Sequence, residues 1–160
     1  MGDRAMTITK LTALVALLAA LTPPCAALAA DPTGTWLTEA GKSRVKIVRC
    51  GNALCGTIVW LREPNDPNTG KPKTDFRNQD ATRRNRAMVG IEIVLGMQPS
   101  GTSDKWTGEV YNPEDGKTYS GSLTMTGANE LSLAGCVLAV LCKSQTWTRE
   151  GSTVPPSSKS

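Results

Sequence analysis

Gly34-Thr35-Trp36 and Trp147-Thr148-Arg149 stand at the two ends of a long run of short β-type segments. A tryptophan on the first strand and an arginine ending the last strand indicate a small barrel, because closure brings those two strands together. In such a barrel the planar guanidinium can cover the indole face. We therefore expect Gly34, Trp36 and Arg149 to close one end of a barrel. The alternative is that they form the floor of a ligand site.

The beginning of the chain has the pattern of an export signal. Lys10 precedes an apolar run at residues 11–21 that is too short to cross a bilayer, and Ala27-Leu28-Ala29 matches an A-x-A cleavage site. The sequence therefore predicts an exported protein of the periplasm or of the cell exterior. It predicts no stable membrane insertion after cleavage. The expected organisation is a cleaved signal peptide at 1–29, one domain at 30–150 and a disordered Ser/Pro-rich tail at 151–160.

After residue 30, runs of β-branched and aromatic residues alternate with turn residues, and helical periodicity is almost absent. Hairpin-length connections favour an up-and-down antiparallel order of about eight strands, and closure removes the exposed sheet edges. The predicted fold class is therefore an all-β, up-and-down antiparallel barrel. Its predicted strands are Gly34–Thr38, Ser43–Cys50, Cys55–Leu61, Met88–Leu95, Lys105–Tyr111, Lys117–Thr126, Glu130–Cys136 and Cys142–Arg149.

Four cysteines follow the signal, and the chain contains no histidine. An even number of cysteines in an exported chain favours disulfides, and three pairings are possible. The short loops within each pair favour Cys50–Cys55 and Cys136–Cys142. A metal site is not expected, because histidine is absent and the spacings differ from those of thiolate zinc sites. No cofactor is predicted.

Large amphipathic side chains on the strands are the first candidate ligand site. Aromatic walls with a few polar groups are typical of small-molecule pockets, although the same side chains can also fill a narrow core. The candidate wall residues are Trp60, Trp106, Tyr119, Gln145 and Trp147.

A polar stretch from Arg62 to Ala87 is the second candidate site. It interrupts the regular strand spacing, and a short helix is expected from Asp80 to Arg86. Arginine suits carboxylates and phosphates, so Arg86, with Asn78 and Asp80, is expected to guard the mouth of the barrel. The alternative is a solvated loop that is held by its own Asp–Arg pairs.

Two sets of motifs resemble known families. Gly34-x-Trp36 with Arg149 resembles the calycin pattern shared by lipocalins and fatty-acid-binding proteins. The wider set consists of Cys50-Gly51-x-x-Leu54-Cys55-Gly56, Asn78-x-Asp80 leading to Arg86 and Gly90, Tyr111-Asn112-Pro113-Glu114-Asp115-Gly116-Lys117-Thr118-Tyr119, Gly135-Cys136 and Gln145-Thr146-Trp147-Thr148-Arg149. Over roughly 31–149, this wider set resembles a family of exported bacterial proteins, the domain-of-unknown-function family 2147. Ala87 departs from the Arg-Pro pair that family members often have at Arg86-Ala87. The resemblance implies a calycin/lipocalin-like barrel in the cell envelope, and it brings no established activity or catalytic residues.

The expected function is the binding or carriage of a small, largely apolar molecule in the envelope. The alternative is a structural or protein-interaction module with a filled barrel and an envelope protein as partner. An enzyme is not expected, because no histidine is present to serve as the usual base. The formal net charge of +4 is too small an excess to indicate a nucleic-acid partner.

Overall fold

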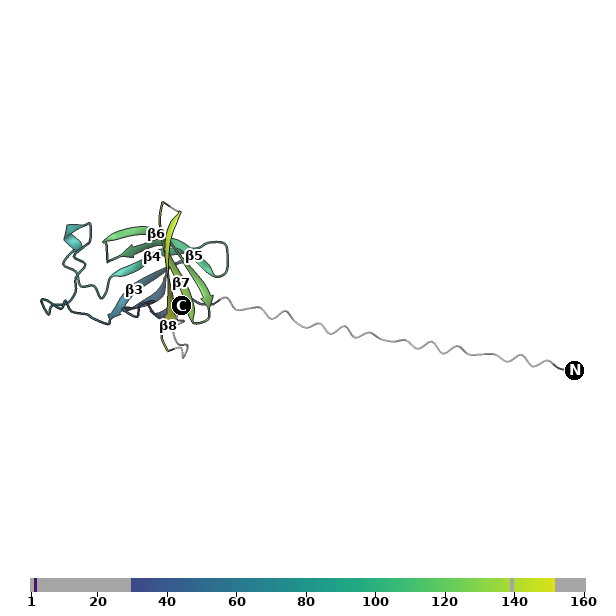
Figure 1. Ribbon diagram of the computed structural model, residues 1–160. Helices are drawn as coiled ribbons and strands as arrows, with labels where there is room; N and C mark the ends of the chain where they lie inside the picture. The colour runs from purple at the N-terminus through teal and green to yellow at the C-terminus, as the bar shows by residue number, and fades with distance from the viewer. Residues whose placement is uncertain (1, 3–29, 139, 152–160) are drawn as a thin grey trace.

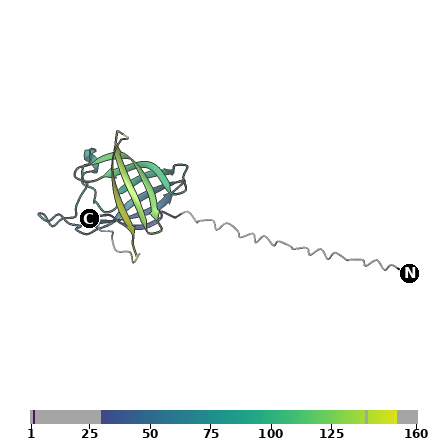
Figure 2. The ribbon, with the colours of Figure 1, turned by 45° about the vertical axis from the view of Figure 1, so that its right-hand side comes forward.

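Each strand of the protein pairs with the next one along the chain, and the last strand pairs with the first. The computed structural model describes residue 2, residues 30–138 and residues 140–151. Within them the eight strands form one closed antiparallel barrel in sequence order, as Figures 1 and 2 show. The strands are β1 (Gly34–Leu37), β2 (Ser43–Cys50), β3 (Ala53–Leu61), β4 (Glu92–Pro99), β5 (Lys105–Asn112), β6 (Lys117–Gly127), β7 (Glu130–Val137) and β8 (Leu141–Arg149).

The predicted all-β up-and-down barrel is confirmed, and one strand is displaced from its predicted position. Residues 88–91 form a turn, in which the Ile91 N–H donates to the Met88 carbonyl oxygen. The strand β4 begins only at Glu92 and extends to Pro99. Gly96 has a positive φ of 55° at a register shift in the β4–β5 pairing, which is typical of a bulge. Strict two-residue alternation therefore does not describe which side chains of β4 are buried.

The first and last strands meet over a short stretch. Trp36 pairs with Arg149, and Leu37 pairs with Thr148. The guanidinium carbon of Arg149 lies 4.3 Å from the ring centroid of Trp36, and the Trp36 side chain is completely buried. The predicted closure of the barrel by Trp36 and Arg149 is therefore present. We call this end of the barrel the closed end, and the opposite end the mouth.

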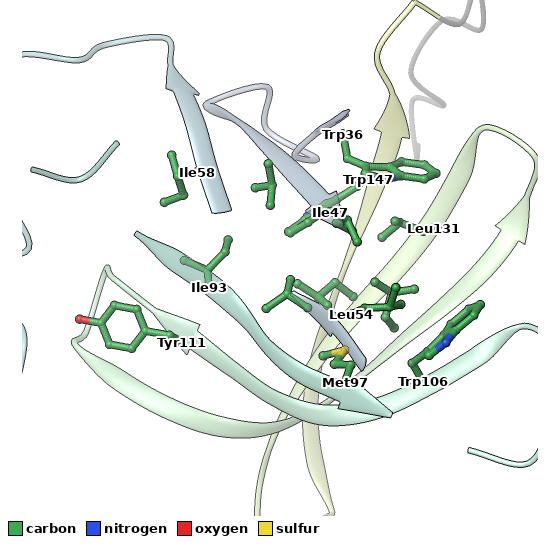
Figure 3. Close-up of a cluster of buried hydrophobic side chains, with 14 of the residues drawn as sticks. Trp36, Ile47, Leu54, Ile58, Ile93, Met97, Trp106, Tyr111, Leu131 and Trp147 are labelled. Carbon is green, nitrogen blue, oxygen red and sulfur yellow. The ribbon is translucent and has the colours of Figure 1, made fainter. Parts of the chain in front are cut away.

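Apolar side chains from all parts of the wall fill the interior. Trp36, Trp106 and Trp147 all belong to this buried cluster, and Figure 3 shows Trp36 beside Trp147. The glycine at position 121 of β6 leaves room for a side chain of the neighbouring strand β5, because an added Cβ would overlap the Val110 side chain. The other members of the cluster are Val45, Ile47, Leu54, Ile58, Ile91, Ile93, Val94, Met97, Tyr111, Leu123, Met125, Leu131 and Leu133.

Two disulfides staple hairpins at opposite ends of the barrel. Cys50 and Cys55 are joined across the β2–β3 turn at the closed end, and Cys136 and Cys142 are joined across the β7–β8 turn at the mouth. Both predicted pairings are confirmed. The predicted signal peptide lies outside the described residues apart from Gly2, and the predicted tail lies outside them apart from Gly151. Within the described chain, no helix has the length and apolar character needed to cross a membrane.

Candidate functional site

The long connection between β3 and β4 is an ordered structure at the mouth of the barrel. Thr74 and Ala87 form an isolated β-bridge, and the Asp75 N–H donates to the Arg86 carbonyl oxygen at 3.0 Å. The Met88 N–H donates to the Lys73 carbonyl oxygen at 2.9 Å. These backbone contacts draw the two arms of the connection together at its base, so residues 75–86 form a closed excursion beside the mouth (Figure 1).

Asp75 is the anchor of this excursion. Its side chain is completely buried, and its Oδ2 accepts hydrogen bonds from Nε and Nη2 of Arg86 at 3.0 and 2.8 Å. The same Oδ2 accepts from Nδ2 of Asn78 at 2.7 Å, while Oδ1 accepts from the Tyr111 hydroxyl at 2.6 Å. A buried carboxylate is stable only when its charge and its lone pairs are satisfied, and these partners do so.

Tyr111 connects the excursion to the barrel wall. It lies on β5 among the buried residues, and Figure 3 shows its hydroxyl directed away from the apolar cluster. The hydroxyl donates to Asp75 and lies 2.8 Å from Nδ2 of Asn78, which donates to it. Burial and the hydrogen bond to Asp75 raise the pKa of Tyr111 above its ordinary value. The phenol therefore stays neutral and keeps donating to the carboxylate at physiological pH.

Asp80 begins a single 3₁₀ turn, Ala81–Arg83, in place of the short helix expected from Asp80 to Arg86. Its Oδ1 accepts from the Thr82 hydroxyl at 2.6 Å and from the Thr82 N–H at 2.9 Å, as an N-terminal cap does. These hydrogen bonds lower the pKa of Asp80. Its Oδ2 lies 3.2 Å from Nε of Arg83, in an exposed ion pair. Asp80 therefore holds the turn and stays charged.

The β5–β6 turn forms the opposite rim of the mouth. Gly116 has a φ of 72°, and a Cβ at this position would overlap the carbonyl group of Arg77. Nη1 of Arg77 donates to the Glu114 carbonyl oxygen at 2.6 Å. The glycine thus permits the turn and the excursion to touch, and the arginine joins them.

Tyr119 stands on the same rim. Its hydroxyl donates to Oδ2 of Asp115 at 2.6 Å, and this bond raises the pKa of Tyr119. Burial works against ionisation of Asp115, but the hydrogen bonds from Tyr119 and from the Lys117 N–H prevail and lower its pKa. The Asp115 carboxylate is therefore ionised and holds the ring of Tyr119 in position.

A pocket of about 680 Å³ lies between the excursion and the β5–β6 rim. It brings together four of the predicted site residues, Asn78, Asp80, Arg86 and Tyr119, from two segments distant in the sequence. The sequence reasoning did not assign Tyr111 or Lys117 to a site. The signal that points to Tyr111 is its position at the start of the turn motif that faces the polar stretch. The full lining is Asn78, Gln79, Asp80, Arg83, Arg86, Glu92, Leu95, Tyr111, Gly116, Lys117, Thr118 and Tyr119.

The other predicted wall residues lie elsewhere. Trp106 and Trp147 are buried in the apolar cluster, 7% and 1% exposed, so packing occupies both of them. Gln145 is exposed and accepts a hydrogen bond from Nε1 of Trp147 at 3.2 Å. Trp60 pairs with Arg44 beyond a bulge in β3, and the guanidinium carbon of Arg44 lies 4.3 Å from its ring centroid. Trp60 is outside the interior cluster, because the bulge changes the alternation of side chains along the strand.

A second hollow, of about 720 Å³, lies at the closed end and is lined in part by Asp31, Thr33, Met125 and Arg149. Arg149 covers Trp36 there and donates to backbone carbonyl oxygens, so its polar atoms already serve the closure. The mouth pocket is the better candidate, because it joins the predicted polar residues to the buried Asp75 network. Among the described residues, no group of His, Cys, Asp and Glu side chains is placed to hold a metal ion.

Comparisons with known proteins agree with this architecture. A solved structure, "Protein HP1028 from the human pathogen Helicobacter pylori belongs to the lipocalin family", is similar to the chain with a TM-score of 0.61 and 21% identity. The alignment covers 74% of this chain and 82% of that one, and at this identity it shows a shared fold. No curated protein matches the sequence. The model of the family described as "Uncharacterized protein conserved in bacteria (DUF2147)" matches residues 34–149. The chain therefore belongs to the DUF2147 family of bacterial proteins, with a lipocalin-like barrel.

Proposed function

We propose that the protein is an exported binding protein that takes a small amphipathic molecule in the mouth pocket. The observation that carries the proposal is the pocket of about 680 Å³ beside the buried Asp75–Arg86 pair. Pockets for small molecules range from about 300 to 1,000 Å³ and combine apolar walls with a few fixed polar groups. In this pocket the apolar surface comes from Leu95, Tyr111 and Tyr119.

The packed interior supports a site at the mouth in place of one deep in the barrel. Leu54, Met97 and Leu123 lie within the interior cluster with at most 1% exposure. A ligand that entered to this depth would have to displace well-packed side chains, which costs stability. A molecule held at the rim needs no such rearrangement.

The lining offers oriented cationic groups to an anionic head group. Arg83 and Arg86 line the pocket and are paired with Asp80 and Asp75, and Lys117 adds a third cation beside the carboxylate of Glu92. Arg86 is held by its two hydrogen bonds to Asp75, so its position is fixed before any ligand arrives. A guanidinium that is already oriented loses little conformational freedom when it binds an anion.

The proposal also states that the protein is exported and that it binds its ligand without catalysing a reaction. Two disulfides within the described chain are typical of an oxidising compartment such as the periplasm or the cell exterior. The mouth residues serve as hydrogen-bond donors, acceptors and charges, and the chain has no histidine to act as the usual catalytic base. A binding protein is therefore favoured over an enzyme.

Native mass spectrometry of the protein purified from its own envelope tests the proposal, and a fluorescent fatty acid serves as probe. We expect a bound small molecule, and we expect Lys117→Glu to weaken probe binding about tenfold, as loss of a charge-assisted contact does. Lys105→Glu makes the same charge change outside the pocket and is the matched control. A ligand-free protein that binds no probe, or equal losses in the two variants, would refute the proposal.

A further inference from the structure

The β7–β8 turn presents an apolar tip to solvent. The sequence between the two disulfide cysteines is Val137-Leu138-Ala139-Val140-Leu141. Leu138 is 83% exposed, Val140 is 78% exposed and Leu141 is 69% exposed. These are the three most exposed large aliphatic side chains among the described residues, and they are neighbours in one turn. We call Val137, Leu138, Val140 and Leu141 the apolar tip.

The backbone conformation at position 138 is unusual for a leucine. Leu138 has a φ of 54°, and within the described ranges it is the one residue other than glycine with a positive φ. Glycine or asparagine adopts this left-handed conformation at lower cost. A glycine or an asparagine would fold more easily there, yet the turn presents a large aliphatic side chain to water. A position that combines a left-handed backbone with an exposed aliphatic side chain is a candidate for function.

The tip is held on a stiff support. Cys136 pairs with Cys142 in the strand register, and the disulfide joins them directly below the tip. Figures 1 and 2 show the ends of β7 and β8 extending beyond the neighbouring strands. The tip is therefore convex and projects from the barrel, so it has the shape of an inserting element and lacks the shape of a groove.

The charge next to the tip indicates a partner. Lys143 is exposed and follows the tip on β8, one residue beyond the disulfide. The sequence from Val137 to Leu141 contains no acidic residue. A lysine at the base of an aliphatic tip complements a layer of anionic head groups above acyl chains.

We propose that the apolar tip inserts into the surface of an anionic membrane, while Lys143 contacts the head groups. The attachment is shallow and reversible, because few side chains enter the acyl layer. It leaves the barrel and the mouth pocket outside the bilayer. The proposal does not depend on a ligand in the pocket, since the tip lies outside the residues that line it.

Flotation with lipid vesicles tests the proposal on the full mature protein. We expect binding to phosphatidylethanolamine–phosphatidylglycerol vesicles and weak binding to phosphatidylcholine vesicles. Val140→Asp should lower the partition coefficient about tenfold or more, because an apolar side chain that enters the acyl layer is replaced by a charge. Lys143→Gln should lower it about fivefold on the anionic vesicles alone. Added salt should have the same selective effect.

Matched variants on the barrel separate insertion from a general loss of charge or fold. Val48→Asp makes the same change at a half-exposed valine of β2, and Lys46→Gln removes an exposed lysine of the same strand. Both should bind vesicles like the wild type. Absence of wild-type binding, or equal losses at Val48 and Val140, would overturn the proposal. So would sedimentation showing that the wild type self-associates without vesicles and that Val140→Asp prevents it, since the tip would then join copies of this chain.

Discussion

Arg149 covers the ring of Trp36 at 4.3 Å and also donates hydrogen bonds to the carbonyl oxygens of Thr33 and Asp31, each at 2.6 Å. Its Nε donates to the Ala128 carbonyl oxygen at 3.1 Å. One side chain at the end of β8 therefore joins the segment before β1 and the β6–β7 turn. The Trp36 ring below it is fixed by its own bond, from Nε1 to the Pro32 carbonyl oxygen.

Truncation of the Trp36 side chain should make the protein much easier to unfold. Trp36→Ala should lower the free energy of unfolding by about 3–5 kcal/mol, because it empties a fully buried aromatic site. Urea denaturation measures the loss. Trp60→Ala is the control, since Trp60 also stacks on an arginine but lies outside the interior cluster, and about 1 kcal/mol is expected there. Similar losses at the two positions would contradict the closure role.

The buried partner of Arg86 predicts a second contrast. Arg86→Met should destabilise the protein by about 3 kcal/mol, because it leaves the buried carboxylate of Asp75 without its cation. Arg83→Met removes an exposed arginine from the pair with Asp80, and a change below about 1 kcal/mol is expected. Chemical denaturation of both variants measures the difference. If the two variants are equally stable, the Asp75 network does not hold the excursion.

Two glycines have nearly the same backbone conformation. Comparing them separates the energy of the contact at the mouth from the cost of a left-handed backbone. Gly51 has a φ of 66° and open space where a methyl group would stand, whereas Gly116 has a φ of 72° and touches Arg77. Gly51→Ala should cost about 1 kcal/mol for the left-handed backbone. Gly116→Ala should cost at least about 1–2 kcal/mol more, because its methyl group must push the rim away from the excursion. Thermal and urea denaturation should rank them in this order.

The tyrosines give a prediction for alkaline pH. Burial and the bond to Asp75 raise the pKa of Tyr111, and the bond to Asp115 raises the pKa of Tyr119, both above the ordinary value of 10.0. A folded-state pKa above the unfolded value means that this stabilisation is complete below about pH 10 and is lost as the pH rises through the folded-state pKa.

Phenolate absorbance can follow both groups, because the chain contains two tyrosines. The native protein should titrate at higher pH than the protein unfolded in guanidinium chloride. Tyr111→Phe leaves Tyr119 as the remaining signal and should remove the part of the titration that belongs to the buried phenol. A native titration that coincides with the unfolded one would show that neither hydroxyl is held by its carboxylate.

Short-range patterns made most of the fold predictable. The two-residue alternation and the turn signals located seven strands to within a few residues, and local cysteine spacing predicted both disulfides. A turn and a bulge caused the two misplacements. Residues 88–91 form a turn, so β4 begins four residues later than predicted. The bulge in β3 moves Trp60 away from the interior, because a single extra residue reverses the faces of everything beyond it.

The mouth was harder to predict because its contacts join segments distant in the sequence. The polar stretch pointed to Asn78, Asp80 and Arg86, and the structure brings these residues to one pocket with Tyr119. The hydrogen bond between Tyr111 and Asp75 spans 36 positions of the chain. Neither residue type nor spacing indicates that pair, since it forms only once the barrel places β5 beside the excursion.

The pairing of β1 with β8 also has a consequence for how a chain made from its amino terminus reaches its final form. The Arg149 guanidinium can cover the Trp36 ring only after β8 has been synthesised, because β8 is the last strand of the barrel along the chain. The hairpins with short turns can form from local contacts as they emerge. The β1–β8 pairing closes at the largest sequence separation in the sheet and carries the largest loop-closure entropy. Until then β1 has an open edge, so a chain cut short before β8 would retain seven strands and expose a surface that other chains can pair with.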